Sequence, residues 1–335
     1  MNRALQLLLG VGVSALCVWL SMKDVHFTEV LAALRGANPL GFVLVMLVTL
    51  GGFWLRAVRW RYFIADGHRI GMRSLFSATM IGFMANNVLP FRLGEFVRPW
   101  ALARREHLSK TTLLATIVVE RAIDMLTLLG IFGMSLLVHR IAANSDAGRL
   151  VQWGARALIG LCLVLTAFVV AAERNRALAQ SLVRWITSPL PGEARARVAH
   201  VLERFLDGLG LFRDLGRLVR VFALSFAMFL CFALALGVSL WSLDIVLPWY
   251  AGLVMLVITA IGIMVPAAPG YIGTLNIACT AGLALFGVGK AQSVPFSWFY
   301  FFSQWLPITA VGLVYLNREG LSLRSLGQAR SGDTA

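Results

Sequence analysis

The stretch that decides the fold is 84-MANNVLPFRLGEFVRPWALARR-105, which interrupts an apolar segment that begins near Ser74. It holds two asparagines, two prolines and a glycine, and the next hydrophobic stretch begins only near Thr111. This composition disfavours a simple membrane-spanning helix and predicts a helix break at Asn86, Asn87 and Pro90. Non-helical backbone is tolerated at membrane depth only where protein or a water-filled cavity satisfies its polar groups. The stretch therefore predicts the wall of a polar site inside a membrane protein.

The composition of the whole chain indicates an integral membrane protein. The 335 residues are 59% hydrophobic and 14% charged, with a mean hydropathy of +0.79, whereas a soluble domain carries about 25% charged residues. The net charge of +14 does not indicate nucleic acid, because the arginines lie in loops beside hydrophobic segments, where they set orientation and meet anionic lipid. Four single cysteines and five scattered histidines predict neither disulfides nor a metal site, and no cofactor is expected.

The hydrophobic segments predict an all-α fold in one polytopic domain over residues 1–335. Two interrupted elements, 74–108 and 247–287, are expected to be re-entrant helical hairpins, the second one broken by Pro266, Pro269, Gly270 and Gly273. The first half runs to about residue 172 and the second from about 219 to 317, and a polar tail follows at 318–335. An arginine-rich segment, 173–218, predicts an amphipathic helix on the cytoplasmic face. Six full spans are expected, at 4–22, 39–60, 111–138, 150–172, 219–240 and 293–316.

Charge asymmetry predicts the orientation of these spans. If each interrupted element returns to its own side, both termini, the loop 56–73, the link 99–110 and the segment 173–218 share one side. With Arg92, Arg98, Arg121 and Arg156 set aside as intramembrane candidates, that side holds 21 Lys and Arg against five on the other, so the positive-inside rule makes it cytoplasmic. The two interrupted elements then enter from opposite faces, which is typical of an inverted repeat with the substrate site between its halves.

Charged residues in the span 111–138 are the first candidates for a site. Glu120 and Asp124 are four residues apart and share one helix face, whereas Arg121 points about 100° away. Arg92 and Arg98 are their expected partners. Two interpretations stay open: a structural ion-pair network that holds an irregular loop, and a polar cavity that accepts an anionic head group.

The second interrupted element supplies uncharged candidates. Its segment 269-PGYIGT-274 predicts a tight turn whose exposed backbone amides could meet a phosphate. Tyr271 and Asn276 are expected to face the same cavity as Asn86 and Asn87, although the two asparagines could equally satisfy free backbone groups.

Three motifs, in order and at comparable spacing, resemble the signatures of the lysylphosphatidylglycerol synthetase transmembrane-region family. They are 87-NVLPFRLGEFVR-98, 119-VERAID-124, and 269-PGYIGT-274 followed by 285-LFGV-288. The resemblance implies a multi-pass protein of the bacterial inner membrane, similar to the flippase domain of the multiple peptide resistance factor but without its synthetase domain. That domain moves aminoacylated phospholipid between leaflets, and other relatives are linked to polyprenyl-phosphate-sugar pathways. Many members carry Glu where this chain has 274-TLN-276. The chain lacks that carboxylate, which disfavours a cationic head group as its ligand.

We therefore predict a lipid flippase rather than an enzyme, with both termini cytoplasmic. Its partners would be membrane lipids with an anionic or phosphate-bearing head group, and a lipid-synthesis enzyme or a second copy of the chain remains open. An intramembrane lipid-modifying enzyme that uses Glu120 or Asp124 as a general base, or a non-catalytic partner of a lipid synthase, is the alternative. The predicted substrate-binding residues are Asn86, Asn87, Arg92, Glu95, Arg98, Glu120, Arg121, Asp124, Pro269, Gly270, Tyr271, Gly273 and Asn276. Among them, Arg92, Arg98 and Arg121 would hold the phosphate, and Glu95, Glu120 and Asp124 would set the polarity of the cavity.

Overall fold

The computed structural model describes residues 25–64, 70–89, 92–138, 215–264 and 269–322, with residues 12, 18, 19, 160, 181, 192 and 326 beside them. The described residues form helices and no strand, as an all-α fold requires. The helices are α2 Phe27–Gly36, α3 Pro39–Arg61, α4 Met72–Val88, α5 Gly94–Glu106, α6 Lys110–Val138, α10 Leu215–Ser242, α11 Ala251–Gly262, α12 Thr274–Ala284 and α13 Lys290–Arg318, with a short 3-10 turn at Pro269–Tyr271.

Several of the expected spans are confirmed as helices. Helices α3, α10 and α13 are long and apolar enough to cross a membrane, and they match the expected spans 39–60, 219–240 and 293–316 closely. Helix α6 is 29 residues long, as expected for 111–138, and carries the three charged residues of the predicted site in its interior. The expected spans 4–22 and 150–172, and nearly all of the segment 173–218, lie outside the described residues.

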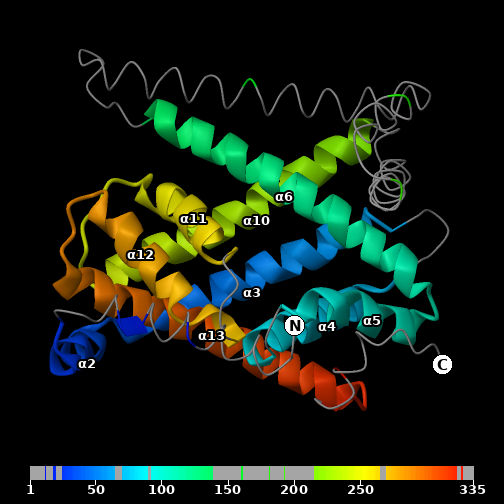
Figure 1. Cartoon of the computed structure of the whole chain (residues 1–335), viewed down its shortest axis with the longest axis horizontal. Helices are drawn as coiled ribbons and strands as arrows, with labels where there is room; N and C mark the ends of the chain where they lie inside the picture. The colour runs from blue at the N-terminus through cyan, green and yellow to red at the C-terminus, as the bar shows by residue number, and fades with distance from the viewer. Residues whose placement is uncertain are drawn as a thin grey trace.

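Helices α3 and α10 form the antiparallel centre of the fold (Figure 1). Gly41 near the start of α3 faces Ser242 at the end of α10, and Gly52 packs against Phe232. At the other end, Arg59 of α3 donates a hydrogen bond to Ser225. A Cβ at Gly41 would lie 1.8 Å from Ser242 Oγ, so the missing side chain lets the helices approach closely.

Helices α4 and α5 form the first of two helix hairpins. A Cβ at Gly94 of α5 would lie 1.9 Å from the carbonyl oxygen of Gly82 in α4, so the two backbones touch at glycines. The expected break at Asn86 and Asn87 is wrong, because α4 continues through both residues to Val88. Asn86 instead uses its side-chain oxygen to accept the N–H of Gly94, at 2.8 Å, which satisfies a free donor at the start of α5.

Helices α11 and α12 form the second hairpin. Gly262, the last residue of α11, packs against Ala278 of α12. The connection turns through Gly270 (φ 74°), Tyr271 (φ 62°) and Gly273 (φ 88°), and such left-handed backbone favours glycine. The expected interruption of this element by Gly270 and Gly273 is confirmed.

The long helix α13 joins the two hairpins. Figure 1 shows α11 and α12 at one end of the molecule, α4 and α5 at the other, and α13 running beneath both. Gly312 of α13 lies against Met84 of α4, and Ser297 bonds Asn276 of α12. The two non-helical connections consequently meet near the middle of α13.

Candidate functional site

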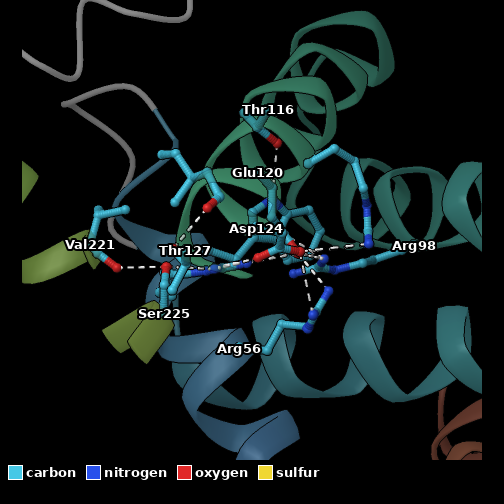
Figure 2. Close-up of polar contacts among 12 residues, drawn as sticks. Arg56, Arg98, Thr116, Glu120, Asp124, Thr127, Val221 and Ser225 are labelled. Atoms are coloured by element: carbon cyan, nitrogen blue, oxygen red, sulfur yellow. Dashed lines mark hydrogen bonds and ion pairs between the residues drawn. The ribbon is translucent and has the colours of Figure 1, made fainter. Parts of the chain in front are cut away.

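A buried ion-pair network joins α3, α5 and α6. Glu120 lies at its centre, and its carboxylate accepts hydrogen bonds from Arg56 at 3.0 Å and Arg98 at 2.9 Å. Arg59 lies 3.2 Å from Glu120 and donates to Asp124 at 2.6 Å. Figure 2 shows the two carboxylates side by side on α6, with Arg56 and Arg98 converging on them from other helices. The prediction that Glu120 and Asp124 share a face is confirmed.

Of the two arginines that the sequence predicts as partners of these carboxylates, one contacts them in the structure. Arg98 is confirmed as a partner of Glu120. Arg92 is not, because none of the ion pairs among the described residues joins it to Glu120 or Asp124. Arg56 and Arg59, which the sequence predicts to lie in the basic cytoplasmic loop 56–73, are instead 5% and 0% exposed and contact both carboxylates. Arg121 makes longer ion pairs with Asp124 at 3.6 Å and Glu120 at 4.0 Å. Their spacing of three residues inside an apolar segment was the available signal, because it places both on one helix face.

Aromatic and hydroxyl groups hold the network in place. The Arg98 guanidinium lies 4.0 Å from the ring centroid of Trp60, which itself donates a hydrogen bond to Thr116 at 2.9 Å. Ser225 of α10 accepts a 2.6 Å hydrogen bond from Arg59. These contacts tie α10 to the network, so four helices meet around two carboxylates.

A cavity of about 210 Å³ lies beside this network. Its charged lining is three arginines and one carboxylate: Arg56, Arg92, Arg121 and Glu95. Amide side chains of Asn86, Asn87 and Gln304 continue the polar wall. The rest of the lining is largely apolar and aromatic, and includes Phe53, Phe83, Phe229, Phe232, Leu256, Leu275, Phe301, Trp305 and Ile308. The cavity is therefore amphipathic, with a cationic part and a hydrocarbon-like part.

The connections of both hairpins meet at this cavity. Arg92, in the first connection, donates a hydrogen bond to the carbonyl oxygen of Ile263 just after α11, and its guanidinium lies 5.3 Å from the ring centroid of Tyr271. Gly270 packs against Trp305 and the carbonyl oxygen of Asn87, where a Cβ would lie within 3.3 Å of both. The expectation that residues of both interrupted elements face one cavity is confirmed for Arg92 and Tyr271.

The predicted site residues separate into three groups. Seven line the cavity: Asn86, Asn87, Arg92, Glu95, Arg121, Gly270 and Tyr271. Arg98, Glu120 and Asp124 form the network behind the wall and are not among the described lining residues, whereas Arg56 is. A contact between Arg98 and the phosphate stays a prediction. Pro269, Gly273 and Asn276 shape the second connection.

Asn276 in particular is a structural residue. It is fully buried, and its side-chain oxygen accepts the N–H of Gly273 at 3.1 Å while its nitrogen donates to Ser297 at 2.9 Å. Both ends of the amide are thus used to hold α12 against α13, and it is not among the described residues that line the cavity. Its role as a ligand-binding residue stays a prediction, and the structure shows it in a supporting position.

Comparison with known proteins identifies the family of this chain. The profile of the family described as "Lysylphosphatidylglycerol synthase TM region" matches residues 7–312. The chain belongs to this family. The match confirms the resemblance found in the three motifs, and the apolar helices agree with an integral membrane protein.

The chain is distantly similar to several curated proteins. The chain is 24% identical over 288 residues to a UPF0104 membrane protein of Methanothermobacter thermautotrophicus, covering 81% of this chain and 82% of that protein. It is 27% identical over 119 residues to UPF0104 membrane protein MJ1595 of Methanocaldococcus jannaschii, covering 33% of this chain and 34% of that one. It is 26% identical over 137 residues to glycosyltransferase AglD of Haloferax volcanii, covering 41% of this chain and 22% of AglD. The chain thus matches only about a quarter to a third of the length of the last two relatives.

No described group of His, Cys, Asp and Glu side chains could hold a metal ion. The network and the cavity within the described ranges contain arginines, carboxylates, amides and aromatic rings. Such a set can bind an anion through charge-assisted hydrogen bonds.

Proposed function

We propose that this protein moves a lipid with a phosphate-bearing head group between the leaflets of a membrane. The observation that carries the proposal is the amphipathic cavity, whose polar wall presents Arg56, Arg92 and Arg121 to any ligand beside a single carboxylate, Glu95. A lipid with an anionic head group matches these two parts of the cavity, because its head group is charged and its chains are apolar. Membership of a family named for a lipid synthase supports a lipid-related role.

The arginines of the wall can donate hydrogen bonds to such a ligand. Arg56, Arg92 and Arg121 all line the cavity. Hydrogen bonds from a guanidinium to a phosphate are charge-assisted and about twice as strong as neutral ones. The cavity is smaller than the roughly 300–1,000 Å³ typical of sites for drug-sized ligands. It therefore suits a head group, with the acyl or prenyl chains left in the bilayer.

In this proposal the two hairpins are re-entrant and form an inverted repeat. The longest of their helices, α4, has 17 residues, and α5, α11 and α12 have 13, 12 and 11. At 1.5 Å per residue even α4 reaches only about 26 Å, short of a hydrocarbon core of about 30 Å. Hairpins that enter from opposite faces and meet at their connections would place a head group near the midplane. The positive-inside count supports cytoplasmic termini, and we propose that the membrane is a bacterial inner membrane.

Lipid translocation in proteoliposomes tests the proposal. Purified full-length protein is reconstituted with a fluorescent phospholipid, and a membrane-impermeant reductant reports how fast inner-leaflet lipid becomes accessible. We expect Arg121→Gln and Arg92→Gln each to slow translocation at least about tenfold, because a hydrogen bond to a charged group contributes about 1.5–3 kcal/mol. The matched control is Arg104→Gln, because Arg104 is exposed on α5 and lies outside the cavity lining.

Two outcomes would contradict the proposal. Wild-type protein that accelerates translocation no more than empty liposomes would remove the transport function. Lipid that is chemically altered after incubation, detected by mass spectrometry, would favour the lipid-modifying enzyme instead.

A further inference from the structure

We propose that the head group that this cavity binds carries two negative charges on a terminal phosphate, as a lipid phosphate monoester does. The inference rests on the proposed lipid-binding function and narrows it to one class of head group. It follows from the charge count around the cavity, from the three arginines in its wall and from the geometry of phosphate.

The cavity wall has a formal surplus of two positive charges. Arg56, Arg92 and Arg121 line it, and Glu95 is the one carboxylate among its described lining residues. The network behind the wall leaves this balance unchanged, because its two further arginines, Arg59 and Arg98, are matched by Glu120 and Asp124. The surplus is therefore the same whether the wall is counted alone or with the network.

A charge surplus that is partly withdrawn from water favours a counter-charge, and here the Arg56 side chain is 7% exposed and that of Arg121 38%. An ion taken out of water without adequate partners costs several kcal/mol, and much of the remaining cavity wall is aromatic or aliphatic. A zwitterionic head group would leave the surplus of two intact, and a phosphodiester would supply one charge. A phosphate monoester, whose second pKa is about 6, supplies nearly two at pH 7 and above.

The carboxylates of the network leave the wall arginines partly free. Glu120 is already surrounded by Arg56, Arg59 and Arg98. Asp124 lies 3.4 Å from Arg56 and 3.6 Å from Arg121, beyond the usual length of a charge-assisted hydrogen bond.

The arginines of the wall match a terminal phosphate in number. Arg56, Arg92 and Arg121 all line the cavity, and the Arg56 side chain is 7% exposed. A phosphate monoester presents three terminal oxygens, and a diester presents two. Three arginines from three elements, α3, the first connection and α6, can therefore each meet one oxygen of a monoester.

A competition experiment tests the inference without relying on transport. Purified full-length protein at pH 8 is mixed with equal amounts of phosphatidic acid and phosphatidylglycerol that carry the same acyl chains, and native mass spectrometry measures which lipid is retained. We expect phosphatidic acid to be preferred about tenfold, the ratio that corresponds to 1.4 kcal/mol of additional interaction. Phosphatidylethanolamine, a zwitterion, should bind more weakly than either.

Variants of the lining residues test whether the cavity wall causes the preference for phosphatidic acid. Arg121→Gln and Arg92→Gln each lower the surplus to one and should reduce the preference for phosphatidic acid to about threefold or less. Glu95→Gln raises the surplus to three and should strengthen binding of phosphatidic acid. Arg104→Gln should leave the ratio at the wild-type value, and thermal unfolding shows whether each variant is folded.

The outcomes separate this inference from the proposed function. Equal retention of the two lipids by wild-type protein would overturn the inference, even if translocation were intact. A preference that survives in both Arg121→Gln and Arg92→Gln would overturn it as well. Displacement of phosphatidic acid by inorganic phosphate at equal concentration would show that the site takes the free anion and not a lipid. A clear preference in a protein that translocates nothing would support the inference and refute the transport function.

Discussion

Replacing Glu120 by glutamine should destabilise the protein strongly, because this side chain is the centre of the buried network. Glu120 is 0% exposed and lies within 3.2 Å of three guanidinium groups, those of Arg56, Arg59 and Arg98. Glutamine preserves the size of the side chain and removes its charge. The change therefore leaves three buried arginines and one carboxylate in the network, Asp124, which contacts Arg56 and Arg59.

The size of the effect follows from the burial of the pair. Removing one partner of a buried ion pair costs about 3–5 kcal/mol, since the other charge stays buried without compensation. A loss of 1 kcal/mol lowers the melting temperature of a chain of 150–250 residues by about 2–4 °C, and the lower figure applies to a longer chain. The melting temperature of the Glu120→Gln variant should therefore fall by at least about 6 °C. Because Glu120 pairs with three arginines and not with one, we expect a loss of stability toward the upper part of this range.

Intrinsic fluorescence during heating is a suitable assay, because Trp60 lies directly under the Arg98 guanidinium. The matched control is Glu106→Gln, the same chemical change at a partly exposed residue 4.0 Å from Arg105, where an ion pair contributes about 0–1 kcal/mol. Adding Arg98→Gln to Glu120→Gln should cost less than the sum of the two single changes, because it removes one stranded charge. Equal melting temperatures of the Glu120→Gln and Glu106→Gln variants would refute the account of the network.

Two further predictions concern the hairpins. Gly94→Ala should lower the melting temperature by several degrees, because its Cβ would lie 1.9 Å from the Gly82 carbonyl oxygen and overpacking costs about 1–3 kcal/mol. Gly237→Ala in α10, with nothing within 4 Å, should be neutral or stabilising by up to about 1 kcal/mol, and equal melting of the two variants would contradict the close contact. Asn276→Ala should cost about 1–3 kcal/mol, because the Gly273 N–H and the Ser297 hydroxyl lose their partner. It should leave the choice between lipids unchanged in the competition assay, and an altered choice would return Asn276 to the cavity.

The helical segments were predictable because their signal is local. Hydropathy over a window of about 20 residues locates α3, α10 and α13 within a few residues of their observed ends. Glycine and proline located the connections between the paired short helices, although α4 continues through both asparagines that were expected to break it and ends one residue later, at Val88. Side-chain hydrogen bonds of Asn86 explain this difference, because an asparagine at a helix end can satisfy the next helix instead of stopping its own.

The sequence by itself thus determined an all-α membrane protein, the position of two interrupted hairpins and the common face of Glu120 and Asp124, since each depends on residues within one or two helical turns. Only the tertiary structure decided which arginines serve those carboxylates. Arg56 and Arg59 lie 64 and 65 positions away from them in the chain, whereas Arg92, which is nearer in sequence, crosses to Ile263 of the other hairpin. Charge alone makes every arginine an eligible partner. Which arginines pair with the carboxylates depends on how closely the helices approach at glycines such as Gly41 and Gly94. Local helix propensity does not determine that approach.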